Sequence, residues 1–503
     1  MSAGKRPVMD AQVMSEGRRW AALGVLVAAV LLLAIDGTVL YLAVPSLTRD
    51  LAPTATQILW IGDIYSLALA GLLVTMGTLA DRVGRKRLLL IGTTAFGLAS
   101  LLAAFSTSAE LLIAARLLLG VAGATIMPST LSIIRNMFAD PRQRTRAIAV
   151  WSAAGGGGIA LGPLVGGALL ERFWWGSVFL INVPIMVALL VTGIILLPES
   201  RDPNPGRFDL LSAGLSMATI VPLVYAVKHA VSDGLDAITL GCLLAGLVLG
   251  VLFVRRQRHL TAPLIDVGLF RNPAFSGAVL ANFIAIFALT GLLFFFSQYL
   301  QLARGFSPLR AGLAEMPATI ASILVVGLVG VAITRLGRGR AIAAGLGLTA
   351  VGLLLVAAAE GAEHYLWLGL ALVPVGLGVG LAMTLTTDVV VSAVPPRKAG
   401  AASAISETAY ELGVALGIAI LGSVVTLAYR AFVAIPEELP GTVQDRIRDS
   451  LASALSVVEP GSDLAHAARE AFVHAMQITS VAAAILAAIA AIAAWRTIPS
   501  TRD

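Results

Sequence analysis

The chain has 503 residues, of which 58% are apolar before its 50 glycines are counted, and only 13% are charged. Soluble domains are roughly 45 to 50% apolar with glycine included and about 25% charged. A water-soluble enzyme, a secreted scaffold and a disordered chain are therefore excluded. The net charge of +6 comes from basic residues that lie between apolar runs, where they mark membrane topology rather than nucleic-acid binding.

Fourteen apolar runs are long enough to cross a bilayer, for which a helix needs roughly 20 residues. If the N-terminus is cytoplasmic, most Lys and Arg residues fall on the side of the two termini, as the positive-inside rule requires. An odd number of spans would break this pattern, so we expect fourteen spans and two cytoplasmic termini. The predicted spans are 21–44, 57–79, 88–106, 111–133, 147–170, 177–197, 210–227, 237–254, 275–300, 312–333, 341–359, 366–388, 400–428 and 474–495.

An internal repeat organises these spans. Leu79–Gly92 (LADRVGRKRLLLIG) aligns with Ala332–Gly345 (AITRLGRGRAIAAG), which pairs the loop after span two with the loop after span ten. We therefore expect an all-α membrane fold with two six-helix bundles and two accessory helices between them, an architecture typical of alternating-access transporters. The expected parts are a tail (1–20), a first bundle (21–197), the accessory helices (198–271), a second bundle (272–496) with an extracytoplasmic loop (431–473), and a tail (497–503).

Ionisable side chains inside spans are costly, and they are functional candidates by default. Asp36, Asp63 and Glu315 are such residues, with a helix-packing hydrogen bond or an interfacial position as the alternatives. Glu407 and Glu411 are four residues apart and so share one helix face. If that face lines a cavity, we expect at least one of the pair to hold a proton near neutral pH; the alternative is a face in outer water or beside an arginine.

Three further span residues are candidates for cation chemistry. Arg116 is the only basic residue deep in a predicted span, and it either acts on a neighbouring carboxylate or forms a permanent ion pair with Asp36 or another acid. Trp60 and Tyr65 are candidates for a cation site through their ring faces; the alternative is a place in the interfacial aromatic belt.

Two further groups of residues predict conformational gating. Gly158, Gly162 and Gly166, with Pro163 among them, give span five a smooth face for close helix contact, either to seal one side against leak or for packing alone. The loop after span two can hold one conformation closed through charged contacts, although part of it serves topology. Its residues are Gly77, Asp81, Arg82, Gly84, Arg85 and Lys86. We expect 431–473 to be a solvated linker, with a short helical lid as the alternative.

Several of these motifs carry a family resemblance. Gly77–Arg87 resembles the signature loop of the major facilitator superfamily, Ala115–Ala124 its fourth-helix motif, and Gly158–Gly167 the fifth-helix motif of its antiporters. Asp36–Pro45 resembles the first-helix motif of the fourteen-span drug:proton antiporters. Trp60–Leu67 and Trp175–Pro184 resemble the QacA and SmvA type of multidrug and quaternary-ammonium efflux pump, and the Ala- and Arg-rich, lysine-poor composition is similar to the LfrA type. The similarity covers nearly the whole chain.

The resemblance implies a proton-coupled antiporter that exports lipophilic, mainly cationic drugs, dyes and antiseptics across the bacterial cytoplasmic membrane. It implies a part for Arg116 in proton transfer and a functional monomer that contacts small cations, protons and lipid. We expect no cofactor and no metal, because the chain has neither a phosphate-binding loop nor metal-ligand spacing among its five histidines. The alternative is an exporter of an endogenous lipid or metabolite. An enzyme is not expected, since the loops hold no clustered nucleophile and base.

Overall fold

The structure is a computed structural model that describes residues 14–201, 209–232, 234–260, 263–395 and 398–500. Parts of the predicted tails (1–13 and 501–503) and of the accessory segment (202–208) lie outside these residues. Within the described ranges every regular element is helical. Fourteen helices are long and apolar enough to cross a membrane, as predicted.

The first bundle is built from long helices with strong start signals. Thr54 and Gln57 form a capping box at the start of the second helix, and the Ser108 side chain caps the fourth. The helices are α1 (Glu16–Leu51), α2 (Ala55–Val83), α3 (Arg85–Ala104), α4 (Ala109–Met137), α5 (Pro141–Leu170), and the pair α6 (Ser177–Leu180) and α7 (Asn182–Leu196), which together form the sixth span.

The second bundle contains one broken span. The predicted span 312–333 is interrupted at Glu315, because Pro317 has no N–H to continue the helical hydrogen bonds. Its pieces are α11 (Pro308–Ala314), α12 (Met316–Leu324), the 3-10 turn η4 (Val325–Leu328) and α13 (Val329–Leu336). The other helices are α10 (Pro273–Gln298), continued by the π-turn η3 (Tyr299–Ala303), and α14 (Arg338–Glu360), α15 (Tyr365–Ser392), α16 (Ala399–Phe432) and α19 (Asp463–Thr497).

The packing of the two bundles follows the sequence repeat. In the first bundle α1 packs on α5, α2 and α3 on α4, and α3 on α7; in the second α10 packs on α16, α12 and α14 on α15, and α14 on α19. Gly84 and Gly337, which the repeat aligns, both have a positive φ, +115° and +78°, at the joint between two helices. Such a backbone favours glycine, so the repeat places a similar tight turn in each bundle.

The two bundles meet along two seams, where α2 packs on α16 and α5 packs on α11. The accessory helix α8 (Leu210–Ser232) covers the first seam, because it contacts both α2 and α16, while α9 (Ala237–His259) packs on α8; η2 (Val267–Arg271) follows. An apolar cluster holds α8 in place; its buried members are Ile64, Leu67, Val224, Ala415 and Ala419.

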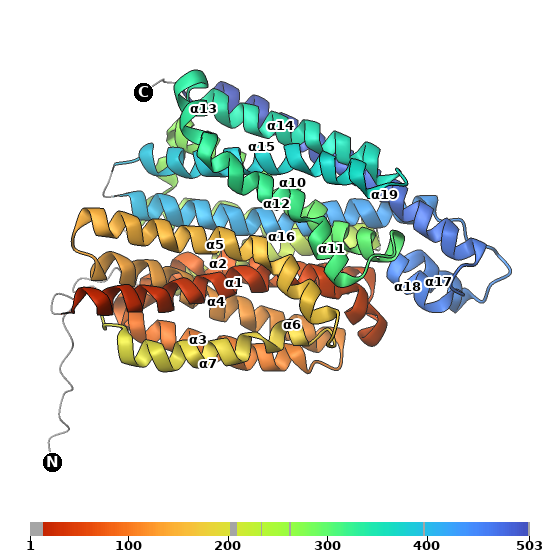
Figure 1. The fold of residues 1–503 in the computed structure, drawn as a ribbon, viewed down its shortest axis with the longest axis horizontal. Coiled ribbons are helices and arrows are strands. Elements are labelled where there is room, and N and C mark those ends of the chain that lie inside the picture. The colour runs from red at the N-terminus through yellow and green to blue at the C-terminus, as the bar shows by residue number, and fades with distance from the viewer. Residues whose placement is uncertain (1–13, 202–208, 233, 261–262, 396–397, 501–503) are drawn as a thin grey trace, which may run out of the picture.

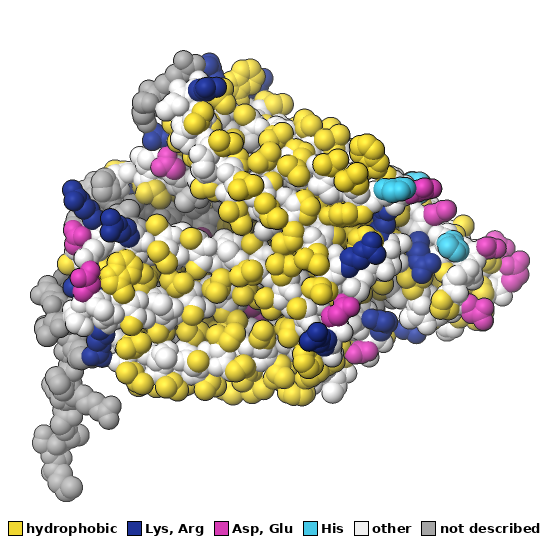
Figure 2. All heavy atoms as spheres, viewed as in Figure 1, with side chains coloured by type: hydrophobic (Ala, Val, Ile, Leu, Met, Phe, Trp, Pro, Cys, Tyr) yellow, Lys and Arg dark blue, Asp and Glu magenta, His cyan; other side chains and the backbone are white. Residues whose placement is uncertain are grey.

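The molecule has two different ends. The helix ends nearest the chain termini form one end, here called the terminal face, and α17 and α18 lie at the other, here called the loop face (Figure 1). The bundles diverge towards the terminal face. Among the described residues, the interbundle hydrogen bonds near the loop face include Gln301 to the Leu42 carbonyl (3.0 Å) and the Leu309 amide to Glu171 (3.3 Å). Figure 2 shows an apolar band between these ends and charged side chains gathered at both.

The segment 431–473 is not the solvated linker that the sequence predicted. It forms α17 (Gly441–Asp449) and α18 (Leu451–Val457), and Ile447, Leu451 and Ala454 are buried. The alternative of a short helical lid is therefore the better description, because these apolar side chains find a core at the loop face.

Candidate functional site

Four helices of the first bundle converge on Asp36. Its carboxylate lies 3.2 Å from a guanidinium nitrogen of Arg116 on α4 and accepts a 2.6 Å hydrogen bond from the Asn182 amide on α7. Asn182 also donates to Ser100 on α3 (3.2 Å). Asp36 is 0% and Arg116 1% exposed. Of the two roles predicted for Arg116, the structure shows the buried ion pair with Asp36.

Tyr65 extends this cluster towards the second bundle. The Arg116 guanidinium lies over the Tyr65 ring, 4.6 Å from its centre, and donates to the Ile61 carbonyl (3.3 Å). Tyr65 interacts electrostatically with both Asp36 and Glu411. The ring is buried, and both the ion pair of the first bundle and a carboxylate of the second act on it electrostatically.

The Glu407 and Glu411 pair lies on α16, which packs against α2. They are about 12 and about 18 Å along α16 from its start at the terminal face. Glu411 is buried and interacts with the hydroxyl of Ser66 on α2; Glu407 is half-buried. Glu411 therefore lies at the contact between the bundles, and Glu407 lies about one turn nearer the terminal face.

Glu315 lies at the break between α11 and α12 and is 6% exposed. One of its carboxylate oxygens has no hydrogen-bond partner within the described residues. Tyr41, on α1 of the other bundle, lies within electrostatic range of both Glu315 and Glu411. Tyr41 therefore links α1 electrostatically to two buried glutamates of the second bundle.

Asp63 has a partner that the sequence did not predict. Lys228 on α8 places its ammonium 2.8 and 2.6 Å from the two carboxylate oxygens and 3.5 Å from the centre of the Trp60 ring. Both charged side chains are buried. The expectation that Arg116 is the only basic residue deep in a span is therefore wrong: the predicted span ended at 227, whereas α8 continues to Ser232.

The acidic candidates of the two bundles thus differ in their partners. Asp36 and Asp63 each pair with a buried cation, whereas within the described ranges no ion pair involves Glu315, Glu407 or Glu411. A buried carboxylate without a counter-ion needs compensation from a bound proton or a bound cation. The same ranges bring together no group of three metal-type ligands.

The glycine stripe of α5 packs on α1. A Cβ on Gly158 would lie 2.6 Å from both the Ala34 Cβ and the Leu31 carbonyl, and one on Gly162 would collide with Thr38. Gly166 is similarly close to Val39. Pro163 instead faces the other bundle, where its carbonyl leaves no room for a Cβ on Gly312 of α11.

The joint between α2 and α3 is hydrogen-bonded to the end of α7. Asp81 pairs with Arg85 at 2.8 Å, and the Lys86 ammonium donates to the Ile194 and Leu197 carbonyls, each at 2.8 Å. Glu199, which the sequence analysis missed, accepts hydrogen bonds from the Lys86 and Arg87 amides at the start of α3. Gly77 and Arg82 belong to α2 rather than to a loop, since only Gly84 separates α2 from α3. Gly77 lies beside Pro128 of α4, and Arg82 is exposed.

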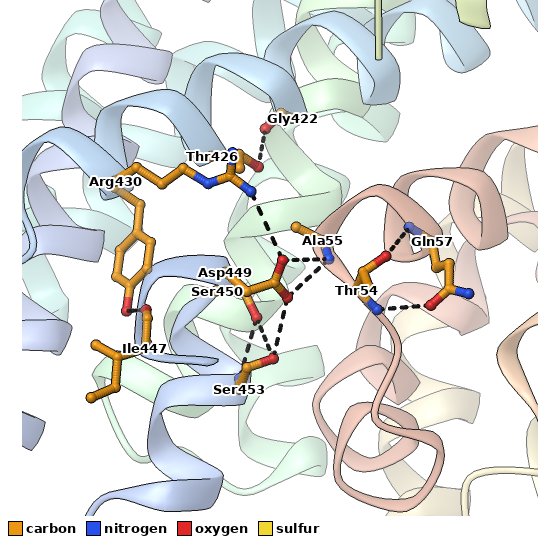
Figure 3. A network of polar contacts seen from close by, with 11 residues as sticks. Thr54, Ala55, Gln57, Gly422, Thr426, Arg430, Ile447, Asp449, Ser450 and Ser453 are labelled. Atoms are coloured by element: carbon orange, nitrogen blue, oxygen red, sulfur yellow. Dashed lines mark hydrogen bonds and ion pairs between the residues drawn. The ribbon is translucent and has the colours of Figure 1, made fainter. Parts of the chain in front are cut away.

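At the loop face a polar network joins the two bundles (Figure 3). The Asp449 carboxylate accepts hydrogen bonds from the Ala55 amide at the start of α2 (3.0 and 3.2 Å) and lies 3.9 Å from Arg430 at the end of α16. The Tyr429 hydroxyl donates to the Ile447 carbonyl (2.9 Å). Burial raises the pKa of Asp449, and the Ala55 amide and Arg430 offset this only in part. We call this network the loop-face clasp.

The partners of Lys228 and Asn182 lie far from them in the sequence, so these pairings are visible only in the three-dimensional structure. Lys228 follows a long apolar run as one of few lysines in the chain, but a lysine at a helix end ordinarily reaches the interface. Glu360, at the end of α14, was also missed: it is 1% exposed and accepts a hydrogen bond from Ser480 (2.9 Å).

Two six-helix bundles that meet around buried ionisable groups are the architecture of a polytopic membrane transporter. Residues 26–418 match the profile of the Major Facilitator Superfamily, and the chain belongs to this superfamily.

Individual relatives match nearly the whole chain. The Multidrug efflux pump LfrA of Mycolicibacterium smegmatis is 48% identical over 479 residues, which cover 94% of this chain and 95% of the relative. The Methyl viologen resistance protein SmvA of Salmonella typhimurium is 36% identical over 484 residues, covering 95% and 98%. A crystal structure of a bacterial homologue of the human lysosomal transporter Spinster, inward-facing and occupied, shares the fold with a TM-score of 0.68 at 17% identity, covering 96% and 98%.

Proposed function

We propose that this protein exports lipophilic, mainly cationic drugs, dyes and antiseptics across the bacterial cytoplasmic membrane by proton-coupled antiport. Both termini lie in the cytoplasm, and the monomer is the functional unit. The proposal includes the division of the chain into two bundles (21–197 and 272–496) with the accessory segment 198–271 between them.

The observation that carries the proposal is the unequal charge compensation of the two bundles. Asp36 and Asp63 each have a buried cation as partner, while Glu407 and Glu411 have none among the described residues. Glu411 lies where α16 contacts α2. A proton and an organic cation can each compensate such a carboxylate, so binding of one lowers the affinity for the other.

This competition produces exchange when access alternates. With cytoplasmic termini, the clasped loop face is the outer side, and the diverging terminal face admits a lipophilic cation from the cytoplasm or the inner leaflet. The cation displaces protons from the glutamates. After the bundles rock, protons from outside displace the cation in turn, driven by ~2.3 kcal/mol per charge for each 100 mV.

The relatives support the same class of cargo. LfrA is named for multidrug efflux and SmvA for methyl viologen resistance, and both match more than nine tenths of this chain. We extend to this chain the export of drugs that these names indicate.

Purified protein in liposomes with an imposed pH step tests the proposal. Cationic dyes are compared with neutral and anionic compounds of similar size. We expect uphill movement of cationic dyes only. The Glu407→Gln and Glu411→Gln variants should lose this drive, whereas Glu363→Gln, an exposed carboxylate between α14 and α15, should keep it.

Two results would count against the proposal. Transport of neutral or anionic compounds in preference to cations would favour an exporter of an endogenous lipid or metabolite. Full proton-driven transport by the Glu407→Gln, Glu411→Gln double variant would show that these carboxylates do not couple the two movements.

A further inference from the structure

The ammonium of Lys228 fills a site built for a cation. It lies within 2.8 Å of both oxygens of Asp63 and 3.5 Å from the centre of the Trp60 ring. Asp63 is 0% and Lys228 1% exposed. A carboxylate and an aromatic face are the two groups that recognise organic ammonium ions, and both act more strongly away from water.

This site borders the proposed transport site. Asp63 and Ser66 are three residues apart on α2, so they lie on neighbouring positions of one helix face. Ser66 interacts with Glu411 of the second bundle, and Arg116 donates to the Ile61 carbonyl, two residues before Asp63. An organic cation beside Glu411 would therefore lie close to the carboxylate of Asp63.

The cation in the site comes from neither bundle. Lys228 belongs to α8, an accessory helix that packs against both α2 and α16. The apolar contacts of Val224 with Ile64 and Leu67 seat the turn of α8 that precedes Lys228. The lysine stem is unbranched and flexible, so its charged end can leave Asp63 while α8 stays in place.

We propose that Lys228 is an intramolecular competitor that occupies the Asp63 and Trp60 cation site and restricts which organic cations the protein binds. The competing ligand is a lipophilic organic cation, so the inference rests on the proposed function for the identity of its cargo. In this role Lys228 is a specificity-determining residue, because a cation must displace the lysine or do without Asp63.

The test compares the binding of tetraphenylphosphonium by purified variants in detergent at pH 8, measured by equilibrium dialysis. Lys228→Met keeps the length of the stem and removes the charge. We expect it to bind the probe about tenfold more tightly than the wild type, since the probe gains a ring face and a free carboxylate. Lys228→Arg should bind as the wild type does.

Two variants control for general effects of charge removal. Lys398→Met deletes an ion pair of the same length, 2.6 Å to Asp266, at the terminal face, and should leave binding unchanged. Asp63→Asn added to Lys228→Met should abolish the gain. If Lys228→Met does not yield folded protein, Lys228→Gln removes the charge while keeping a donor for Asp63.

Equal affinity of the wild type and the charge-removing Lys228 variants would overturn the inference, and so would a gain that survives Asp63→Asn. Either result is distinct from a failure of the proposed function. That failure would appear as a wild type that moves no cation in the pH-step assay, and the dialysis experiment would still report whether Asp63 accepts a cation once Lys228 is neutralised.

Discussion

Replacing Arg116 by methionine isolates the energetic importance of the ion pair inside the first bundle. The substitution removes the guanidinium 3.2 Å from Asp36 and leaves that carboxylate, 0% exposed, with only the Asn182 amide. It also removes the cation from above the Tyr65 ring. We expect Arg116→Met to lower the free energy of unfolding strongly.

The magnitude follows from the distance and the burial. Two unit charges about 4 Å apart interact by about 4 kcal/mol at an effective dielectric constant of about 20. Removing one partner of a buried pair typically costs about 3 to 5 kcal/mol, so we expect a loss in that range for Arg116→Met. Because Asp36→Asn removes the other charge, the double variant should lose less than the sum of the single losses, by about 2 kcal/mol or more.

Unfolding in mixed micelles of increasing SDS content, followed by the fluorescence of the seven tryptophans, measures these values. The exposed Arg82 provides the matched control, and Arg82→Met should change stability by no more than about 0.5 kcal/mol. Additive losses for Arg116→Met and Asp36→Asn would refute the reasoning, because they would show that the two charges do not stabilise one another.

The remaining predictions concern helix contact, the clasp and coupling. Gly158→Ala would bring a Cβ to 2.6 Å from α1 backbone and should cost about 1 to 3 kcal/mol, whereas Gly156→Ala, with no atom within 4 Å, should change stability by less than about 1 kcal/mol. Burial raises the pKa of Asp449, so the closed clasp binds a proton more tightly than the open one. The clasp should therefore be strongest in acid and weaken as pH rises through that raised pKa. Asp449→Asn should remove this pH dependence. Asp36→Asn should abolish uphill, proton-driven ethidium export in everted vesicles.

The SDS titration measures the two glycine variants side by side. Opening of the clasp is measured with the Ile58→Cys variant in a Cys242→Ala background, which has no other cysteine. The rate at which a thiol reagent labels this cysteine is followed as a function of pH. Arg430 and Arg446 also interact electrostatically with Asp449. If Asp449→Asn leaves the pH profile of labelling unchanged, the pH dependence comes from a group other than Asp449. Ethidium export retained by Asp36→Asn would contradict a coupling role for that residue.

Hydropathy, charge and the repeat predicted the spans and the two-bundle architecture because these are local or periodic properties of the chain. They also identified Asp36 and Arg116 as exceptional, since a charge within an apolar run is visible in one dimension. The choice between an ion pair and a proton-transfer role for Arg116 needed distances between helices. Lys228 was missed because the predicted span ends at 227, one residue before it, whereas α8 continues to Ser232. The prediction therefore placed a buried lysine in a loop.

The prediction for the segment 431–473 was wrong for a different reason. A solvated linker was expected, but α17 packs on α16 and α18 packs on α19 and on α1, which lies far away in the chain. One sequence alone does not reveal which distant helices a segment packs against.

The accessory helix α8 makes the two flanks of the protein different. It packs on both helices of the seam between α2 and α16, so a movement of one bundle against the other along this seam requires α8 to slide against α2 or α16. The opposite seam, between α5 and α11, has glycine and proline at the crossing, and α8 does not cover it. Three helices therefore close one flank of the interface between the bundles, whereas the direct contact of two helices closes the other.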